Sequence, residues 1–360
     1  MYSKELRAIK KSNRFRDRII YDDKLVDLAS NDYLGLSSMP QLLTRAVARV
    51  QMFKNHGPKS SQVVNGYHQI HKDFEDFLCR QHGFEDAILA GSGFLANMAL
   101  IEALPRKGDI LILDEEYHAS GILAAKLVDT QVIMFEHNKP EKLEEILKTH
   151  DYKRAIIAVE GIYSMSGNLL DKKIFEIVNR YENTLLIVDE AHSSGVVGEK
   201  LLGVFELFSI EPQPNHIKMG TLGKAYGSYG AYILASKHIV EFLQNRAKSL
   251  VYATAPSLID IELAHQGMLY MMKHREALHV EIKKRQEIVK KYFDIDMKGL
   301  IFEYVMQSSE EVLKKQEELK EVGFLVGAIR PPTVEKPMLR IIPRVDVSIE
   351  DLERLFDVYM

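Results

Sequence analysis

A lysine within a run of glycines, and a carboxylate that ends an apolar stretch, are the features of this chain best suited to chemistry. Lys224 lies within Gly220–Gly230, and Asp189 follows the apolar residues 185–188. A lysine amine can form a Schiff base with an aldehyde, and a carboxylate can keep a pyridinium nitrogen protonated. Pyridoxal phosphate needs both groups, so the two segments together predict an enzyme that uses this cofactor.

Other polar residues follow expected strands. His118 comes after the apolar run 110–113, where an imidazole could stack on a flat ring or carry protons. Ser164 comes after 155–159 and could contact the cofactor, and His192 could hydrogen-bond the cofactor's ring oxygen. Ligands of open parallel sheets bind at the carboxyl ends of the strands, so we expect these side chains to converge. A plain polar contact is the alternative for His118, and a turn cap is the alternative for Ser164.

The segment Gly91–Asn97 predicts a phosphate cradle. It follows an expected strand and opens an expected helix, and its small residues let backbone N–H groups approach an anion near the helix N-terminus. Thr221, three residues before Lys224, could donate its hydroxyl to the same phosphate. An ordinary strand–helix turn is the alternative.

Arg340 is the candidate for binding a substrate carboxylate. It alternates with apolar neighbours in 338–341, so its side chain should point to one face of a short strand. A guanidinium directed into a cleft suits a bidentate contact with a carboxylate. A surface charge is the alternative.

The elements that must position these residues alternate between strand and helix. Helical patterns such as 140–148 and 172–181 lie between apolar runs, and this alternation predicts an α/β fold with a mostly parallel sheet. The expected buried strands are 87–90, 110–113, 132–135, 155–159, 185–188 and 232–235. A short strand is expected at 25–28.

The pattern changes near residue 257. A long or broken helix over 257–292, short strands near 300–305 and 338–342, and a helix at 307–322 predict a smaller α+β domain. Ser348 begins a capping box for the last helix. We therefore expect an N-terminal segment over 1–45, a large cofactor-binding domain over 46–256 and a small domain over 257–360.

Composition narrows the class of protein. The chain has 360 residues, of which 46% are hydrophobic, enough for a large core and a second domain. A net charge of −4 gives no basic field for nucleic acid, and no apolar run approaches the length of a membrane span. The single cysteine, Cys79, excludes an intramolecular disulfide and fits a reducing cytosol. We expect a cytoplasmic protein without a secretory signal, a membrane span or a metal site.

Taken together, these motifs resemble those of the α-oxoamine synthase family of fold-type-I pyridoxal-phosphate enzymes. The matching segments are 30–36, 91–97, 118–120, 160–167, 188–195, 221–230 and 330–333. The resemblance extends over roughly residues 14–357, and it implies a large domain with a mostly parallel sheet, a smaller α+β C-terminal domain and a homodimer with shared sites.

The reaction implied by the resemblance joins a small amino acid to an acyl thioester with loss of carbon dioxide. The residues 329–334 favour L-alanine and a pimeloyl thioester, carried by CoA or acyl carrier protein, as in biotin biosynthesis. Glycine with acetyl-CoA, the 2-amino-3-ketobutyrate CoA ligase reaction, or glycine with succinyl-CoA is the sister alternative. A lyase or aminotransferase on the same fold, and a regulatory homologue without activity, are the others.

The resemblance also assigns roles to individual residues. It implies that Lys224 is the Schiff-base lysine and general base, Asp189 the pyridinium partner, His118 the residue stacked on the ring and His192 the donor to the ring oxygen. The remaining implied cofactor contacts are Gly93, Phe94, Ser164, Thr221 and, from a neighbouring subunit, Thr254. The implied substrate contacts are Asn31 and Arg340 at the amino-acid carboxylate, His118 at the acyl oxygen, and Thr333 with Arg14 or Arg16 at the acyl substrate.

Two segments depart from the family pattern. Glu190 follows Asp189 where the family usually has a second aspartate. The segment Gly57–Gln62 replaces a glycine-serine run that usually ends in arginine, which leaves the acyl-donor contacts of this segment open.

Overall fold

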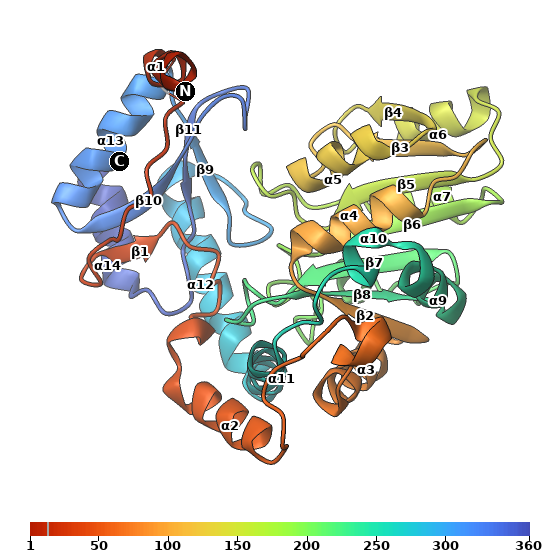
Figure 1. Ribbon diagram of the computed structural model, residues 1–360. Coiled ribbons are helices and arrows are strands. Elements are labelled where there is room, and N and C mark those ends of the chain that lie inside the picture. The colour runs from red at the N-terminus through yellow and green to blue at the C-terminus, as the bar shows by residue number, and fades with distance from the viewer. Residues whose placement is uncertain (13) are drawn as a thin grey trace.

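A seven-stranded sheet is the larger of two sheets in the computed structural model, which describes residues 1–12 and 14–360 (Figure 1). Its strand order is β2-β8-β7-β6-β5-β3-β4. Only β8 runs antiparallel to its neighbours. The strands are β2 (Asp86–Ala90), β3 (Ile110–Asp114), β4 (Gln131–Phe135), β5 (Ala155–Glu160), β6 (Thr184–Asp189), β7 (His216–Thr221) and β8 (Ala231–Ala235).

Helices cover both faces of this sheet because its strands carry apolar side chains on both sides. In β3, Ile110 and Ile112 belong to one hydrophobic cluster, and Leu111 and Leu113 to another. The second cluster includes α4 (Gly93–Ala103), α5 (Ala119–Ala124), α9 (Lys237–Arg246) and α10 (Lys248–Val251). The first includes α3 (Gln69–His82), α6 (Pro140–Thr149), α7 (Lys173–Val178) and α11 (Leu258–Lys273). The predicted α/β fold with a mostly parallel sheet is confirmed.

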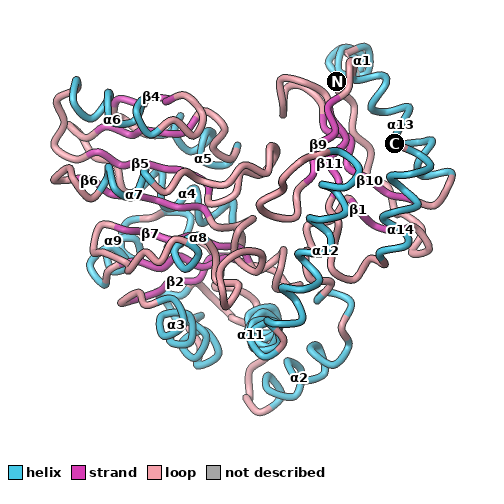
Figure 2. Tube along the Cα trace, turned by 180° about the vertical axis from the view of Figure 1, so that it is seen from behind, coloured by secondary structure: helices cyan, strands magenta, loops and turns pink. Residues whose placement is uncertain are grey.

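A second sheet of four strands lies apart from the first, as both views show (Figures 1 and 2). Its order is β1-β10-β11-β9, with β1 parallel to β10 and the other pairs antiparallel. The strands are β1 (Val26–Leu28), β9 (Phe302–Val305), β10 (Phe324–Ile329) and β11 (Met338–Ile341). Its hydrophobic cluster includes α12 (Arg275–Phe293), α13 (Ser309–Glu321) and α14 (Ile349–Arg354).

The expected long or broken helix after residue 257 is broken: α11 ends at Lys273 and α12 begins at Arg275. Ser348 caps α14 by accepting a hydrogen bond from the Asp351 N–H, as its sequence predicts.

The N-terminal strand β1 pairs with the C-terminal sheet, and the domain division at residues 45 and 256 stays a prediction. The other helical elements are α1 (Ser3–Lys11), α2 (Pro40–Gln51), α8 (Val204–Leu207) and short turns at Leu36–Ser38, Gln62–Gly66, Ala125–Leu127 and Leu355–Tyr359. Within the described residues, no helix combines the length and apolar character that a membrane crossing requires.

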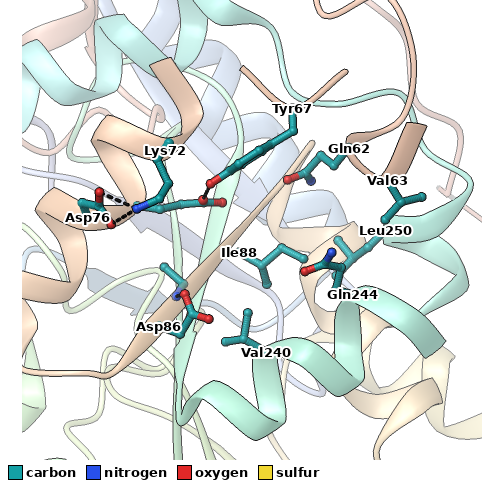
Figure 3. A pocket seen from close by; sticks show the side chains of 12 residues that line it. Gln62, Val63, Tyr67, Lys72, Asp76, Asp86, Ile88, Val240, Gln244 and Leu250 are labelled. Atoms are coloured by element: carbon teal, nitrogen blue, oxygen red, sulfur yellow. Dashed lines mark hydrogen bonds and ion pairs between the residues drawn. The ribbon is translucent and has the colours of Figure 1, made fainter. Parts of the chain in front are cut away.

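Side chains, rather than another strand, satisfy the outer edge of β2. The Gln62 amide donates to the Leu89 carbonyl at 2.8 Å, and the Leu89 N–H donates to the Glu75 carboxyl at 3.1 Å. The Tyr67 hydroxyl donates to the second oxygen of Glu75. Gln62, Tyr67 and Glu75 line a cavity of about 200 Å³ (Figure 3). Pairing the edge groups in this way hinders association with a strand of another chain.

Glu75 should make stability depend on pH. Burial raises the pKa of Glu75 from 4.5 to about 8, although the hydrogen bonds from Tyr67 and Leu89 oppose the shift. The folded state therefore holds this proton more tightly than the unfolded state, so its stabilising contribution is complete below about pH 4.5 and is lost as pH rises towards 8. We expect wild type to lose stability relative to Glu75→Gln by an amount on the order of 3 kcal/mol between about pH 5 and 8. Urea denaturation of both proteins across this range measures the difference, with exposed Glu310→Gln as control. Parallel stability curves for wild type and Glu75→Gln would contradict the prediction.

Candidate active site

The predicted site residues of the large domain lie along one edge of the seven-stranded sheet. Asp189 ends β6 and Thr221 ends β7, while His118 and Ser164 follow β3 and β5. Because β3, β5, β6 and β7 are parallel neighbours, their carboxyl ends meet at the same edge. The parallel arrangement of these strands thus places an imidazole, a serine, a carboxylate and a threonine in one row along the sheet edge.

The Lys224 amine lies within this row. Its Nζ is 2.6 Å from Nε2 of His192, and its side chain is half-buried. Desolvation lowers the pKa of Lys224 to about 8, although the carboxyl groups of Asp189 and Glu160 oppose the shift. The neutral amine is therefore well populated near pH 8, and a neutral amine is the form that attacks a carbonyl or accepts a proton.

The Asp189 carboxylate is buried and held in a fixed direction. Its Oδ2 accepts a hydrogen bond from the Asn97 amide at 2.8 Å, and its Oδ1 accepts one from the Ala191 N–H at 3.0 Å. The Tyr117 hydroxyl donates to the Asn97 carbonyl oxygen at 2.6 Å, which turns the Asn97 NH₂ group towards the aspartate. The carboxylate is consequently an oriented anion in a water-poor setting, suited to a cationic ring nitrogen.

His118 caps α5 and is joined to the same network. Its Nδ1 lies 2.7 Å from the Ser120 hydroxyl, which also accepts a hydrogen bond from the Asn97 amide at 3.1 Å. Burial lowers the pKa of His118, with Asp189 opposing and Lys224 adding to the shift. A neutral imidazole ring therefore lies beside the aspartate and the lysine.

The small sheet supplies an arginine to the site. Arg340 Nε donates to the Ser164 carbonyl at 2.8 Å, and its Nη1 donates to the Asn31 side-chain oxygen at 2.9 Å. Only 6% of Arg340 is exposed, so it is not a surface charge. The arrangement brings together two predicted carboxylate contacts, Asn31 from the loop after β1 and Arg340 from β11.

The opposite part of the site is suited to an anion. Gly93 begins α4, and a Cβ placed on it would lie 3.7 Å from Thr221 Cβ. The Thr221 hydroxyl donates to the Gly230 carbonyl at 3.1 Å and accepts from the Gly223 N–H. Phe94 is half-exposed in the first turn of α4. This helix is 11 residues long, so its free N–H groups and dipole favour a phosphate here.

The remaining predicted residues lie towards solvent. Arg14 and Arg16 are both exposed, and Arg16 Nη2 donates to the Thr333 hydroxyl at 3.3 Å. The structure thus joins Thr333 to Arg16. Thr254 is exposed in the loop before α11, and its contact with a neighbouring subunit stays a prediction.

Several residues at the site received no individual role from the sequence: Tyr33, Asn97, Tyr117 and Glu160. Glu160 lies beside Asp189 in strand register, and its Oε2 accepts from the Ser164 N–H at 2.9 Å. Its buried Oε1 has no partner among the described residues. Burial raises the pKa of Glu160 well above its ordinary value, and the Asp189 charge adds to this. Its position in the sequence could have identified it, since Glu160 ends β5 just as Asp189 ends β6.

The donor set fits pyridoxal phosphate. An amine of lowered pKa, a fixed carboxylate, neutral imidazoles and a helix N-terminus with a threonine hydroxyl match its aldehyde, ring nitrogen, ring oxygen and phosphate. The unpartnered Glu160 Oε1 is a further polar group left for a ligand. Among residues 1–12 and 14–360, no cluster of histidine, cysteine, aspartate or glutamate side chains is arranged to hold a metal ion.

Comparisons with known proteins agree with this geometry. The model of the family "Aminotransferase class I and II" matches residues 23–358. The chain is 44% identical over 356 residues to 8-amino-7-oxononanoate synthase of Helicobacter pylori, covering 99% of this chain and 95% of the relative.

Two solved structures share the fold. Sphingomonas wittichii serine palmitoyltransferase has a TM-score of 0.90 and 24% identity, covering 100% of this chain and 97% of that one. The 8-amino-7-oxononanoate synthase of Francisella tularensis has a TM-score of 0.76 and 24% identity, covering 94% and 97%. At these identities the likeness to both structures concerns the fold.

Proposed function

Because the chain belongs to the aminotransferase class I and II family, we propose that it condenses L-alanine with a pimeloyl thioester to form 8-amino-7-oxononanoate, with loss of carbon dioxide. It is a pyridoxal-phosphate-dependent acyltransferase of the α-oxoamine synthase type. The 44% identity to a relative named for this synthase, over 99% of the chain, is the observation that carries the proposal. The site geometry supports it, because a carboxylate-binding arginine lies beside the cofactor groups.

Pyridoxal phosphate, when bound, supplies an aldehyde that joins an amine and a ring that withdraws electrons. In this proposal Lys224 holds the aldehyde carbon, Asp189 faces the ring nitrogen, His118 stacks on the ring and His192 donates to the ring oxygen. The other cofactor contacts are Ser164, Thr221, the backbone of Gly93 and Phe94, and Thr254 of a neighbouring subunit.

The same side chains then guide the substrates. Arg340 and Asn31 bind the alanine carboxylate, and the amine of Lys224, once released by the amino acid, removes the α-proton. His118 would assist proton transfer to the acyl oxygen. Thr333 and Arg16 meet the acyl substrate, which CoA or acyl carrier protein delivers. We place the enzyme in the cytoplasm as a homodimer whose sites are shared between subunits, and in biotin biosynthesis.

Thiol release by the purified protein, loaded with pyridoxal phosphate, tests this function. We expect release with pimeloyl-CoA or pimeloyl acyl carrier protein when alanine is present, a much slower release with glycine, and a product of the mass of 8-amino-7-oxononanoate. Protein freed of its cofactor is the control. Release from acetyl-CoA with glycine, and none from either pimeloyl thioester, would replace the proposal with the sister activity.

A further inference from the structure

Tyr33 joins two residues of the site. It follows β1 in the chain, yet its hydroxyl lies 2.5 Å from Nδ1 of His192, beyond the end of β6. The side chain is fully buried, and the Val345 N–H donates to the Tyr33 carbonyl at 2.9 Å, which holds this loop in place. The two aromatic rings meet edge to face with centroids 6.0 Å apart.

The Tyr33 hydroxyl keeps its proton. Burial raises the pKa of Tyr33 to about 12, although a hydrogen bond with Arg340 and its positive charge oppose the shift. Among the described residues, the hydrogen-bonding partners of this hydroxyl are one guanidinium and one imidazole nitrogen, while Glu160 acts on it only through its charge. A guanidinium carries only donors, so it cannot accept the phenolic proton. The proton must point to Nδ1 of His192.

The direction of this hydrogen bond determines the tautomer of His192. Burial lowers the pKa of His192 well below its ordinary value, and the charges of Lys224, when it is protonated, and of Arg340 add to this, so the imidazole is neutral. A neutral imidazole carries one proton, and an Nδ1 that accepts from Tyr33 leaves that proton on Nε2. The opposite tautomer would leave the Tyr33 O–H without an acceptor among its described contacts, and a buried unsatisfied donor is destabilising.

We propose that Tyr33 is a positioning residue that favours the Nε2–H tautomer of His192, so that the imidazole presents a donor at the face where Lys224 lies. In the protein without cofactor, Nε2 lies 2.6 Å from Nζ of Lys224, and this N–H donates to the lysine once its amine is neutral, above about pH 8. On the proposed function, the same N–H donates to the ring oxygen of the cofactor. Only this second contact rests on the proposed function, because the tautomer is a property of the protein alone.

Nitrogen NMR of protein labelled with ¹⁵N-histidine tests the tautomer directly, because protonated and unprotonated ring nitrogens have distinct chemical shifts. His192→Gln identifies the signals of His192. Above about pH 8, where the Lys224 amine is neutral, we expect a protonated Nε2 and an unprotonated Nδ1 in cofactor-free wild type, and a mixture of both tautomers in Tyr33→Phe. Tyr163→Phe is the matched control, because Tyr163 is also fully buried and its hydroxyl donates to Asp114 at 2.7 Å, away from His192. This control should keep the wild-type pattern.

Loading the same proteins with pyridoxal phosphate tests how the His192 tautomer affects turnover. We expect Tyr33→Phe to lower kcat/KM for alanine about tenfold, with little change in the KM for the thioester. A wild-type His192 protonated on Nδ1 would overturn the proposal without the need for any variant, and so would a Tyr33→Phe protein that retains a pure Nε2–H form. Wild type with the expected tautomer but without thiol release would refute the proposed function and leave the tautomer assignment standing.

Discussion

Lys224→Ala is expected to abolish both the covalent attachment of pyridoxal phosphate and turnover. The structure gives this amine two properties that the reaction needs: a pKa lowered to about 8 by burial, and a place beside His192 and Asp189 at the edge of the sheet. Alanine has neither a nucleophile for the aldehyde nor a base for the α-proton. The visible absorption of the bound cofactor and the rate of thiol release measure the two losses.

Lys224→Arg keeps the positive charge but removes the nucleophilic amine, because a guanidinium stays protonated and cannot attack the aldehyde. We expect it to be as inactive as Lys224→Ala. Lys237→Ala, at an exposed lysine, should bind cofactor and turn over normally. Borohydride reduction followed by peptide mass analysis should find the cofactor on Lys224 in wild type. Normal turnover by Lys224→Ala, or attachment at another lysine, would refute the assignment.

Asp189→Asn is expected to lower kcat by about a thousandfold or more, equivalent to roughly 4 kcal/mol of transition-state stabilisation. The substitution preserves size, but a neutral amide cannot hold a ring nitrogen in its cationic form. The NH₂ group of the new side chain would also face another donor, either the Asn97 amide or the Ala191 N–H, both of which donate to the carboxylate in wild type. Single-turnover and steady-state rates with alanine measure the loss.

Asp109→Asn is the matched control for this variant. Asp109 is also buried, and it pairs with Arg154 at 2.7 Å, but it precedes β3 and so lies at the other end of that strand from the site. We expect Asp109→Asn to reduce stability and to leave kcat unchanged. A loss of less than about tenfold in Asp189→Asn, roughly 1.4 kcal/mol, would mean that the carboxylate does not stabilise the cofactor ring.

The strand ends were predictable because the signal is local. A buried strand appears in the sequence as an apolar run, and the polar residues that follow within a few positions lie at the sheet edge. His118, Ser164 and Asp189 were found in this way, and the structure places them in one row. β7 is less obvious, because Lys218 interrupts its apolar run. Its amine is buried and pairs with Glu190 at 3.2 Å, a compensation that the strand's own sequence does not reveal.

The sequence by itself thus determined the α/β class and singled out Lys224 and Asp189 as the candidate cofactor lysine and its carboxylate partner, since periodicity and residue type specify these within short segments. Only the tertiary structure decided that Tyr33 meets His192, that Arg340 meets Asn31 and Ser164, and that β1 pairs with β10. The partners in each of these contacts are far apart in the chain, and no local pattern relates them. They meet because three hydrophobic clusters pack the two sheets and their helices together, which fixes where polar side chains from distant segments are buried against one another.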